Sequence, residues 1–270
     1  MLTRIISGAA MILIVGGILA LGYFYPVVLV SFIAIICAIG CYEILNNTGI
    51  AKKKTVTIGA LVYGFLSVFV NCGYIKIADY SVKSEVLTVL FALFIVVCAL
   101  SFHKSMDMGA IGAAFAFPVM ISYAFSSLVL LYSGKSGVFF LLLLLNFSSV
   151  CDTGAYFTGV LLGKHKLCPE ISPKKTVEGA VGGILFSLIC TVILCFVFNR
   201  VSDLIILLIL TVVFCIIGMC GDLFASVLKR SVGIKDYGKL IPGHGGILDR
   251  FDSILLIAPV MYLFISGGVF

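Results

Sequence analysis

Acidic, basic and hydroxyl side chains are concentrated between Gly221 and Asp252 of an otherwise apolar chain. Only 11% of all residues are charged. Burying an ion in hydrocarbon costs several kcal/mol unless the ion is paired or bound to a ligand. The segment therefore predicts a reaction site whose partner is a metal-bound, phosphate-rich molecule. The side chains concerned are Asp222, Ser226, Lys229, Arg230, Lys235, Asp236, Lys239, His244, Asp249, Arg250 and Asp252.

The first four of these residues have helical spacing. Asp222, Ser226, Lys229 and Arg230 stand at i, i+4, i+7 and i+8, which predicts that they share one helical face. A carboxylate and a hydroxyl can bind a divalent cation, and two basic side chains can neutralise phosphate charge. An Asp222–Lys229 ion pair alone would not need the other two side chains. The face therefore favours a site for a cation and a phosphate.

A glycine-rich turn follows, from Pro242 to Gly246, just before acids at the mouth of the last apolar run. Glycines allow close backbone approach, and a turn that leads into a helix can direct several N–H groups at an anion. Asp249 and Asp252 are three residues apart and so can share a helical face. The predicted ligands of Mg²⁺, or of Mg²⁺ and a second metal ion, are Asp222, Asp249 and Asp252.

A second polar segment covers residues 151–179. Asp152 interrupts the end of an apolar run, where a carboxylate either reaches back to water or forms the wall of a site. Lys175 and Thr176 belong to a loop, SPKKT, whose side chains suit phosphate oxygens, although basic loops are common in membrane proteins. Asp152, Lys175 and Thr176 are predicted to bind substrate.

Composition determines which elements must position these side chains. Hydrophobic residues make up 62% of the 270-residue chain, which excludes a water-soluble domain and predicts an all-α, polytopic integral membrane protein. Windows of about 19 residues predict about nine transmembrane helices. These lie near residues 5–22, 26–44, 56–75, 84–102, 109–132, 138–161, 179–198, 204–225 and 253–269.

Charge bias predicts the orientation of these spans. If the nine spans alternate in direction, 14 of the 18 Lys and Arg residues lie on one side. Because basic residues gather in cytoplasmic loops, the N-terminus and both polar segments are expected in the cytoplasm and the C-terminus outside. The catalytic residues are then expected at the cytoplasmic ends of the C-terminal helices.

The two halves of the chain differ in chemistry. In residues 1–135 the polar side chains stand singly in loops, apart from Lys52 to Lys54, which are typical of a topology signal and a contact with anionic lipid. These helices are expected to provide support or a dimer surface. Residues 136–270 are expected to form the catalytic region, within one continuous membrane domain.

Residues 226–252, SVLKRSVGIKDYGKLIPGHGGILDRFD, resemble the signature of the CDP-diglyceride synthetases, also called phosphatidate cytidylyltransferases. In that signature a Ser, a Lys-Arg pair and a Lys-Asp pair precede a Pro-x-His-Gly-Gly turn and an Asp-Arg-x-Asp motif. Every one of those positions is filled here. The blocks DTGAY and SPKKTVEG are also similar, so that the resemblance covers about residues 150–253.

The resemblance implies that the protein transfers a cytidylyl group from CTP to phosphatidate, giving CDP-diacylglycerol and pyrophosphate for phospholipid biosynthesis. It implies a bacterial plasma membrane enzyme whose active site faces the cytoplasm, with CTP, phosphatidate and membrane lipids as partners, a homodimer left open, and no nucleic acid. His244 would orient the attacking phosphate, act as a general base or cap a helix. The expected catalytic residues are Asp222, Asp249, Lys229, Arg230 and His244. The expected substrate-binding residues are Ser226, Lys239, Gly245, Gly246, Arg250, Lys175, Thr176 and Asp152.

Two other functions fit part of the pattern. A CTP-dependent lipid kinase would also need magnesium, a nucleotide and a membrane alcohol, but it would release CDP rather than pyrophosphate. A cation-coupled transporter could use Asp152 and Asp222 at broken helices. A transporter needs polar groups that reach both membrane faces, whereas the polar side chains here cluster on the predicted cytoplasmic side.

Overall fold

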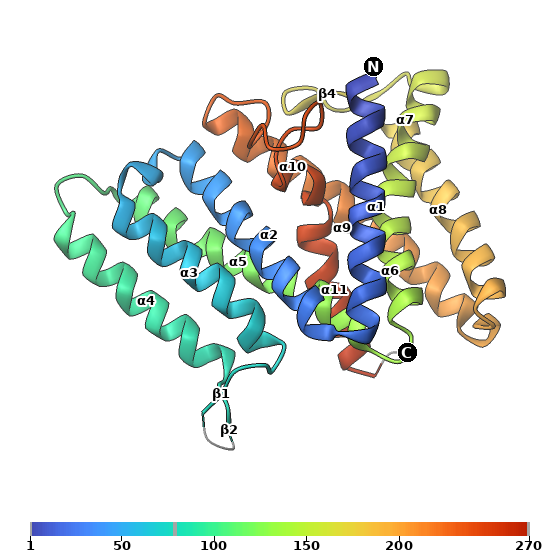
Figure 1. The fold of residues 1–270 in the computed structure, drawn as a ribbon. Coiled ribbons are helices and arrows are strands. Elements are labelled where there is room, and N and C mark those ends of the chain that lie inside the picture. The colour runs from blue at the N-terminus through green and yellow to red at the C-terminus, as the bar shows by residue number, and fades with distance from the viewer. Residues whose placement is uncertain (1, 78–79, 269–270) are drawn as a thin grey trace. The chain divides into compact units, whose positions relative to one another are not determined.

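The computed structural model describes residues 2–77 and 80–268, most of which are helical (Figure 1). Two short antiparallel hairpins, β1–β2 and β3–β4, connect helices. In chain order the elements are α1 (Leu2–Phe24), α2 (Pro26–Asn47), η1 (Ile50–Lys52), α3 (Lys54–Asn71), β1 (Lys76–Ile77), β2 (Tyr80–Ser81), α4 (Ser84–Ser101), α5 (Met108–Ser133), α6 (Gly137–Leu145), η2 (Asn146–Val150), α7 (Cys151–Leu162), β3 (Lys166–Cys168), β4 (Ser172–Thr176), α8 (Val177–Val197), η3 (Val201–Asp203), α9 (Leu204–Ser231), α10 (Leu248–Phe251) and α11 (Ile254–Ser266).

In the described part of the chain, eight helices are long and apolar enough to cross a membrane. The sixth of these, Gly137–Leu162, combines α6, the π-helical turn η2 and α7. The ninth predicted span corresponds to the shorter apolar helix α11, and residue 269 of that prediction lies outside the described residues. The prediction of an all-α, polytopic membrane protein is confirmed.

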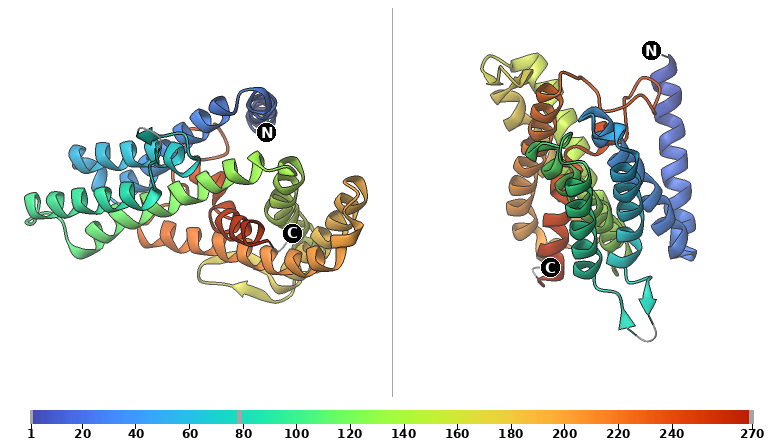
Figure 2. Two further views of the ribbon diagram at one scale, coloured as in Figure 1. Left: turned by 90° about the horizontal axis from the view of Figure 1, so that it is seen from below. Right: turned by 90° about the vertical axis from the view of Figure 1, so that its left-hand side faces the viewer.

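The helices form two compact units, and the first comprises residues 1–130 and 234–251. Within it α2 packs against α1 and α3, and α3 packs against α4. The β1–β2 hairpin joins α3 to α4 and extends beyond the ends of these two helices (Figure 2). The buried side chains of α2 and α3 are mostly apolar, and the exceptions are Glu43 on α2 and the hydroxyls of Thr57 and Ser67 on α3.

Residues 234–251 cluster with the first unit, although they follow α9 in the chain. Polar groups of α2 bind this segment. Asn47 Nδ2 donates to the Tyr237 carbonyl oxygen at 2.6 Å. The rings of Phe125 and Phe251 also pack together, with 5.1 Å between their centroids. Contacts between side chains distant in sequence thus decide where this segment packs.

The second unit comprises residues 131–233 and 252–270. Its helices α7 and α8 approach each other closely because glycines lie where they meet. A Cβ added at Gly183 would come within 2.5 Å of the Cys151 carbonyl oxygen, and one at Gly182 within 2.2 Å of Thr158 Oγ1. These glycines are therefore required for the helix contact, as is usual where membrane helices pack backbone to backbone.

Replacing Gly183 by Leu should push α7 away from α8 and lower the stability of the second unit. Overpacking costs about 1–3 kcal/mol, which corresponds to a fall in Tm of about 3–10 °C for a chain of this length. Thermal unfolding of the detergent-purified variant measures it. Gly17→Leu is the control, because nothing lies within 4 Å of a Cβ at that position. Equal Tm values for the two variants would contradict the close packing.

A buried polar network connects three segments of the second unit. Asn146 Nδ2 in η2 donates to the Ser187 carbonyl oxygen and to Thr191 Oγ1, both at 3.0 Å. The hydroxyls of Thr191 on α8 and Thr211 on α9 are 2.8 Å apart. Burying a polar side chain costs free energy unless the side chain forms hydrogen bonds. The network therefore fixes the register of the helices that carry the polar site.

Candidate active site

The polar face predicted on α9 is present in the second unit. Asp222 and Ser226 are partly buried, and Lys229 is buried. Arg230 is exposed, because the residue after Lys229 points to a different side of the helix. Helical spacing thus brings three of the four predicted side chains to the inner face and leaves Arg230 outside it.

A cavity of about 450 Å³, here called the carboxylate cavity, opens between α7, α8, α9 and the β3–β4 hairpin. One part of its wall is charged and another part is apolar. A cavity with both kinds of wall suits a ligand that has an anionic group beside a hydrocarbon part. Its lining residues are Asp152, Ala155, Tyr156, Gly159, Val160, Lys166, Leu167, Lys174, Lys175, Thr176, Gly179, Ala180, Met219 and Asp222.

The charges in this cavity come from segments far apart in the sequence. Lys175 Nζ forms an ion pair with Asp222 Oδ2, and each side chain is 24% exposed. Asp152 interacts electrostatically with both Lys175 and Asp222. The two polar segments of the sequence therefore meet here, at Asp152, Lys175 and Asp222. Partial burial means that water screens these charges less than it screens surface charges.

Asp252 lies beside the same group of charges. A Cβ at Gly221 would come within 3.0 Å of the Asp252 carbonyl oxygen, so that this glycine lets the Asp252 backbone pack on α9 next to Asp222. The pKa of Asp252 is raised to about 7, mainly by burial and also by the negative charge of Asp222, while Lys229 opposes the shift. Asp152, Asp222 and Asp252 thus interact with one another, and Lys175 and Lys229 oppose the repulsion between these carboxylates.

The predicted metal site can be compared with these positions. Among the described residues, no group of three or more His, Cys, Asp and Glu side chains is arranged to hold a metal ion by itself. Mg²⁺ commonly takes only one or two carboxylates and fills its shell with water and substrate phosphates. Asp222 and Asp252 fit that requirement. Asp249 belongs to the first unit, and its predicted place in the metal shell stays a prediction.

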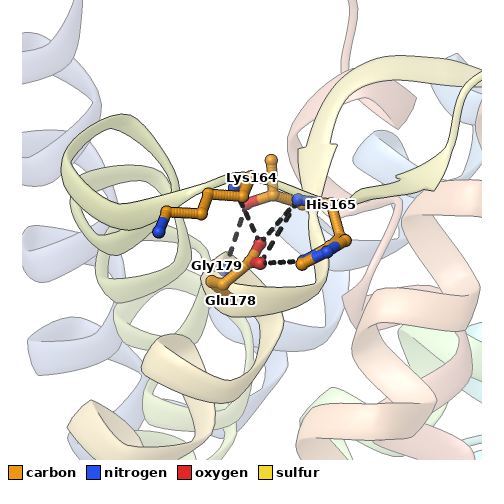
Figure 3. Close-up of polar contacts among 5 residues, drawn as sticks. Lys164, His165, Glu178 and Gly179 are labelled. Atoms are coloured by element: carbon orange, nitrogen blue, oxygen red, sulfur yellow. Dashed lines mark hydrogen bonds and ion pairs between the residues drawn. The ribbon is translucent and has the colours of Figure 1, made fainter.

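Hydrogen bonds connect the start of the β3–β4 hairpin to the first turn of α8. They hold in place the hairpin lysines that line the carboxylate cavity, Lys166, Lys174 and Lys175. The Glu178 carboxylate accepts hydrogen bonds from the backbone N–H groups of Lys164 and His165 at 3.1 and 3.2 Å (Figure 3). Glu178 Oε1 also lies 2.5 Å from His165 Nδ1. Thr176 Oγ1 accepts from Gly179 N at 3.1 Å and caps α8, while Thr176 also lines the carboxylate cavity.

The glycine-rich loop, residues 236–249, lies in the first unit, and backbone hydrogen bonds give it its shape. Ile241 N donates to the Gly245 carbonyl oxygen, and His244 N donates to the Ile241 carbonyl oxygen, both at 2.9 Å. Gly243 and Gly245 have φ values of +80° and +86°, which side chains other than glycine rarely adopt. The sequence therefore needs glycine at these two positions to make the turn.

Asp249 contributes to this shape. Its Oδ2 atom accepts the Tyr237 and Gly246 N–H groups at 2.7 and 3.0 Å. A buried carboxylate that binds two amides holds the two ends of the loop together. One oxygen of this predicted metal ligand therefore has a structural task as well.

A second cavity, of about 630 Å³, lies within the loop and is here called the loop pocket. Three basic side chains and one acidic side chain face it, which favours an anionic ligand. The His244 ring also lies here, and its Nδ1 atom is 2.9 Å from Ser7 Oγ of α1. The lining residues are Lys235, Asp236, Gly238, Lys239, Ile241, Pro242, Gly243, His244, Gly245 and Arg250.

The sequence reading missed Glu43 and Ser7, because it treated the first half as lacking chemistry apart from Lys52 to Lys54. Glu43 binds the backbone of the glycine-rich loop, and Ser7 contacts His244. A signal for Glu43 was present. It is an acidic residue within the apolar run 26–44, and such a residue suggests a functional contact by default.

The sequence is similar to those of known proteins. A phosphatidate cytidylyltransferase of Staphylococcus haemolyticus is 49% identical over 110 residues, which are 41% of this chain and 42% of that protein. One of Bacillus subtilis is 50% identical over 115 residues, 43% of each chain. One of Staphylococcus aureus is 33% identical over 251 residues, 90% of this chain and 94% of that protein. The chain therefore spans less than half of the first two relatives and nearly all of the third.

The match to a family model extends beyond the polar segments. The model of the cytidylyltransferase family matches residues 2–267, which include both units and both cavities. The chain belongs to the cytidylyltransferase family.

Proposed function

We propose that the protein transfers the cytidylyl group of CTP to phosphatidate, which yields CDP-diacylglycerol and pyrophosphate. The observation that carries the proposal is the match over 94% of a Staphylococcus aureus protein named phosphatidate cytidylyltransferase. The two charged cavities support it, since both substrates are polyanions and one of them is a lipid. The protein is an integral membrane protein with eight candidate spans in its described part.

The triphosphate of CTP is assigned to the loop pocket. Lys235, Lys239 and Arg250 line it, and Asp236 is the one acidic side chain in that lining. Such a cation-rich loop can counter much of the charge of a triphosphate. The backbone at Gly243 and Gly245 carries no side chain and allows close approach of a phosphate.

The phosphate of phosphatidate is assigned to the carboxylate cavity. Lys174 and Lys175 can bind its oxygens, while Val160 and Met219 offer an apolar wall to the glycerol and the first acyl carbons. Val160 is 68% exposed on α7, so that a lipid can reach this wall from the side of the helices. The mixed lining matches a lipid phosphate better than it matches a water-soluble nucleotide.

The reaction is a displacement at phosphorus. A phosphate oxygen of phosphatidate forms a bond to the α-phosphorus of CTP, and the bond from that phosphorus to the pyrophosphate oxygen breaks. A phosphate that is already ionised near neutral pH does not need a base to make it nucleophilic. The contribution of the protein is therefore to hold two polyanions together and to neutralise their repulsion.

In the second unit, the charged residues in and beside the carboxylate cavity would bind the phosphate of phosphatidate and neutralise its charge. The ion pair with Asp222 holds the Lys175 ammonium group in the cavity, where it can bind the attacking phosphate. Asp222 and Asp252 would hold Mg²⁺, with Asp249 as the further predicted ligand. Mg²⁺, when bound, supplies positive charge to the phosphates and to the departing pyrophosphate. Lys229 limits the mutual repulsion of the carboxylates.

A direct assay tests the proposal. The detergent-purified chain is incubated with α-labelled CTP, phosphatidate and Mg²⁺, and the expected result is label in the organic phase together with an equal amount of pyrophosphate. Chelation of divalent cations should stop both signals. Release of CDP with a newly phosphorylated lipid would indicate a lipid kinase instead. Absence of any product would reject the transferase.

Assay of inverted and right-side-out vesicles with external CTP tests the proposed cytoplasmic side of the plasma membrane.

A further inference from the structure

A buried carboxylate of α2 binds the glycine-rich loop from 204 and 205 residues away in sequence. Glu43 Oε1 accepts the Ile247 N–H at 2.9 Å, and Glu43 Oε2 accepts the Leu248 N–H at 3.0 Å. Glu43 is only 6% exposed. Leu248 is the first residue of α10, and backbone N–H groups at a helix start lack partners within the helix. The carboxylate therefore caps α10 with both of its oxygens.

Two glycines of the loop make room for this carboxylate. A Cβ at Gly238 would come within 2.4 Å of Glu43 Oε1, and one at Gly246 would do the same. Neither glycine has a positive φ, so that backbone conformation does not require glycine at either position. The space that a side chain would fill is occupied by Glu43. The second glycine of the Gly245–Gly246 pair is thus explained by a residue of α2.

A second side chain of α2 holds the other end of the loop. Asn47, one turn after Glu43, donates to the Tyr237 carbonyl oxygen at 2.6 Å. Asp249 joins the two ends by binding both Tyr237 N and Gly246 N. Lys239 and His244 lie in the stretch between these anchors, and Arg250 follows directly. The positions of these three side chains in the loop pocket therefore depend on α2.

A carboxylate suits this position better than the isosteric amide. Both oxygens of Glu43 accept from N–H groups. Gln would offer one acceptor and would point its own N–H₂ group at the other backbone N–H. A buried donor that faces a donor is costly, because neither can bind water instead.

We propose that Glu43 is a positioning residue for nucleotide binding: its carboxylate holds the glycine-rich loop in the shape that presents Lys239, His244 and Arg250 to the CTP phosphates. This inference rests on the proposed function. Glu43 acts through the loop and does not itself touch substrate. Its loss should therefore affect the KM for CTP more than the KM for phosphatidate.

Substitution of Glu43 by Gln, Asp and Ala tests this role in the full-length, detergent-purified protein. For Glu43→Gln, kcat/KM for CTP should fall at least tenfold, and amide hydrogen exchange in the peptide that contains residues 245–249 should become faster. Glu43→Ala should show larger changes, and Glu43→Asp should recover part of the loss because it keeps two acceptor oxygens. The matched control is Glu85→Gln, which changes an exposed glutamate of the same unit and should leave both measurements unchanged.

Each outcome bears on one of the two proposals. Unchanged exchange at residues 245–249 in Glu43→Gln, or an equal loss of kcat/KM for both substrates, would overturn the positioning role. Absence of product with the unsubstituted protein would overturn the proposed function, and the exchange data would then show whether the anchor exists.

If Glu43 variants fail to fold, Gly246→Ala provides the second test, because its methyl group would displace the Glu43 carboxylate. It should reproduce the rise in KM for CTP, and a normal KM would contradict the inference.

Discussion

Asp222→Asn should lower the rate of CDP-diacylglycerol formation by about a thousandfold, the scale of losing a key electrostatic group at a reaction centre. Asp222 is central to the charges of the second unit, since it pairs with Lys175 and interacts with Asp152 and Asp252. Asn keeps the size of the side chain but removes its charge. It therefore weakens any cation bound there and releases the Lys175 ammonium group. Initial rates with saturating CTP and phosphatidate measure the effect.

Asp203→Asn is the matched control for this prediction. Asp203 lies in the same unit, immediately before α9, and is also half of an ion pair, with Arg200 at 3.1 Å. Its turnover should equal that of the unsubstituted protein. A metal-binding role predicts that Asp222→Asn also raises the Mg²⁺ concentration needed for half-maximal rate. If Asp222 only held the Lys175 ammonium group, that concentration would stay unchanged. An Asp222→Asn protein within tenfold of normal turnover would exclude Asp222 from the reaction centre.

Local periodicity explains what could be predicted of this site from the sequence. The inward positions of Asp222, Ser226 and Lys229 follow from the period of one helix, and α9 is continuous through all three. The spans follow from runs of apolar residues, because only helices satisfy the backbone within a membrane. These features depend on neighbouring residues and so can be read directly from the chain.

Contacts between distant residues explain what could not be predicted. Nothing in the local sequence around Glu43 indicates that it binds Ile247 and Leu248, and nothing around Thr176 distinguishes a helix cap from a phosphate ligand. The position of residues 234–251 depends on the same kind of contact. Gly238 and Gly246 are the only trace of this contact in the local sequence. They are glycines because Glu43 occupies the space that a side chain at either position would fill.

Asp249→Asn separates the two tasks of Asp249. One oxygen, Oδ2, accepts both the Tyr237 and the Gly246 N–H, and the amide oxygen of Asn can take over both bonds. The loop should therefore keep its shape and its slow hydrogen exchange. The lost charge should still reduce turnover by at least about a hundredfold and raise the Mg²⁺ concentration needed for half-maximal rate. Asp249→Ala should lose activity and loop protection together.

Asp107→Asn is the control in the first unit. Asp107 Oδ1 accepts from Ala110 N at 2.9 Å, a bond that Asn can keep, so that this variant also removes one charge without removing an acceptor. It should behave normally. Near-normal turnover of Asp249→Asn would remove Asp249 from the metal shell and leave it only as the loop's acceptor.

If Asp222 and Asp249 stabilise the same transition state, the double Asn variant should be no slower than the slower single variant, because residues that act as a unit are not additive. Multiplied losses would mean that the two carboxylates act independently.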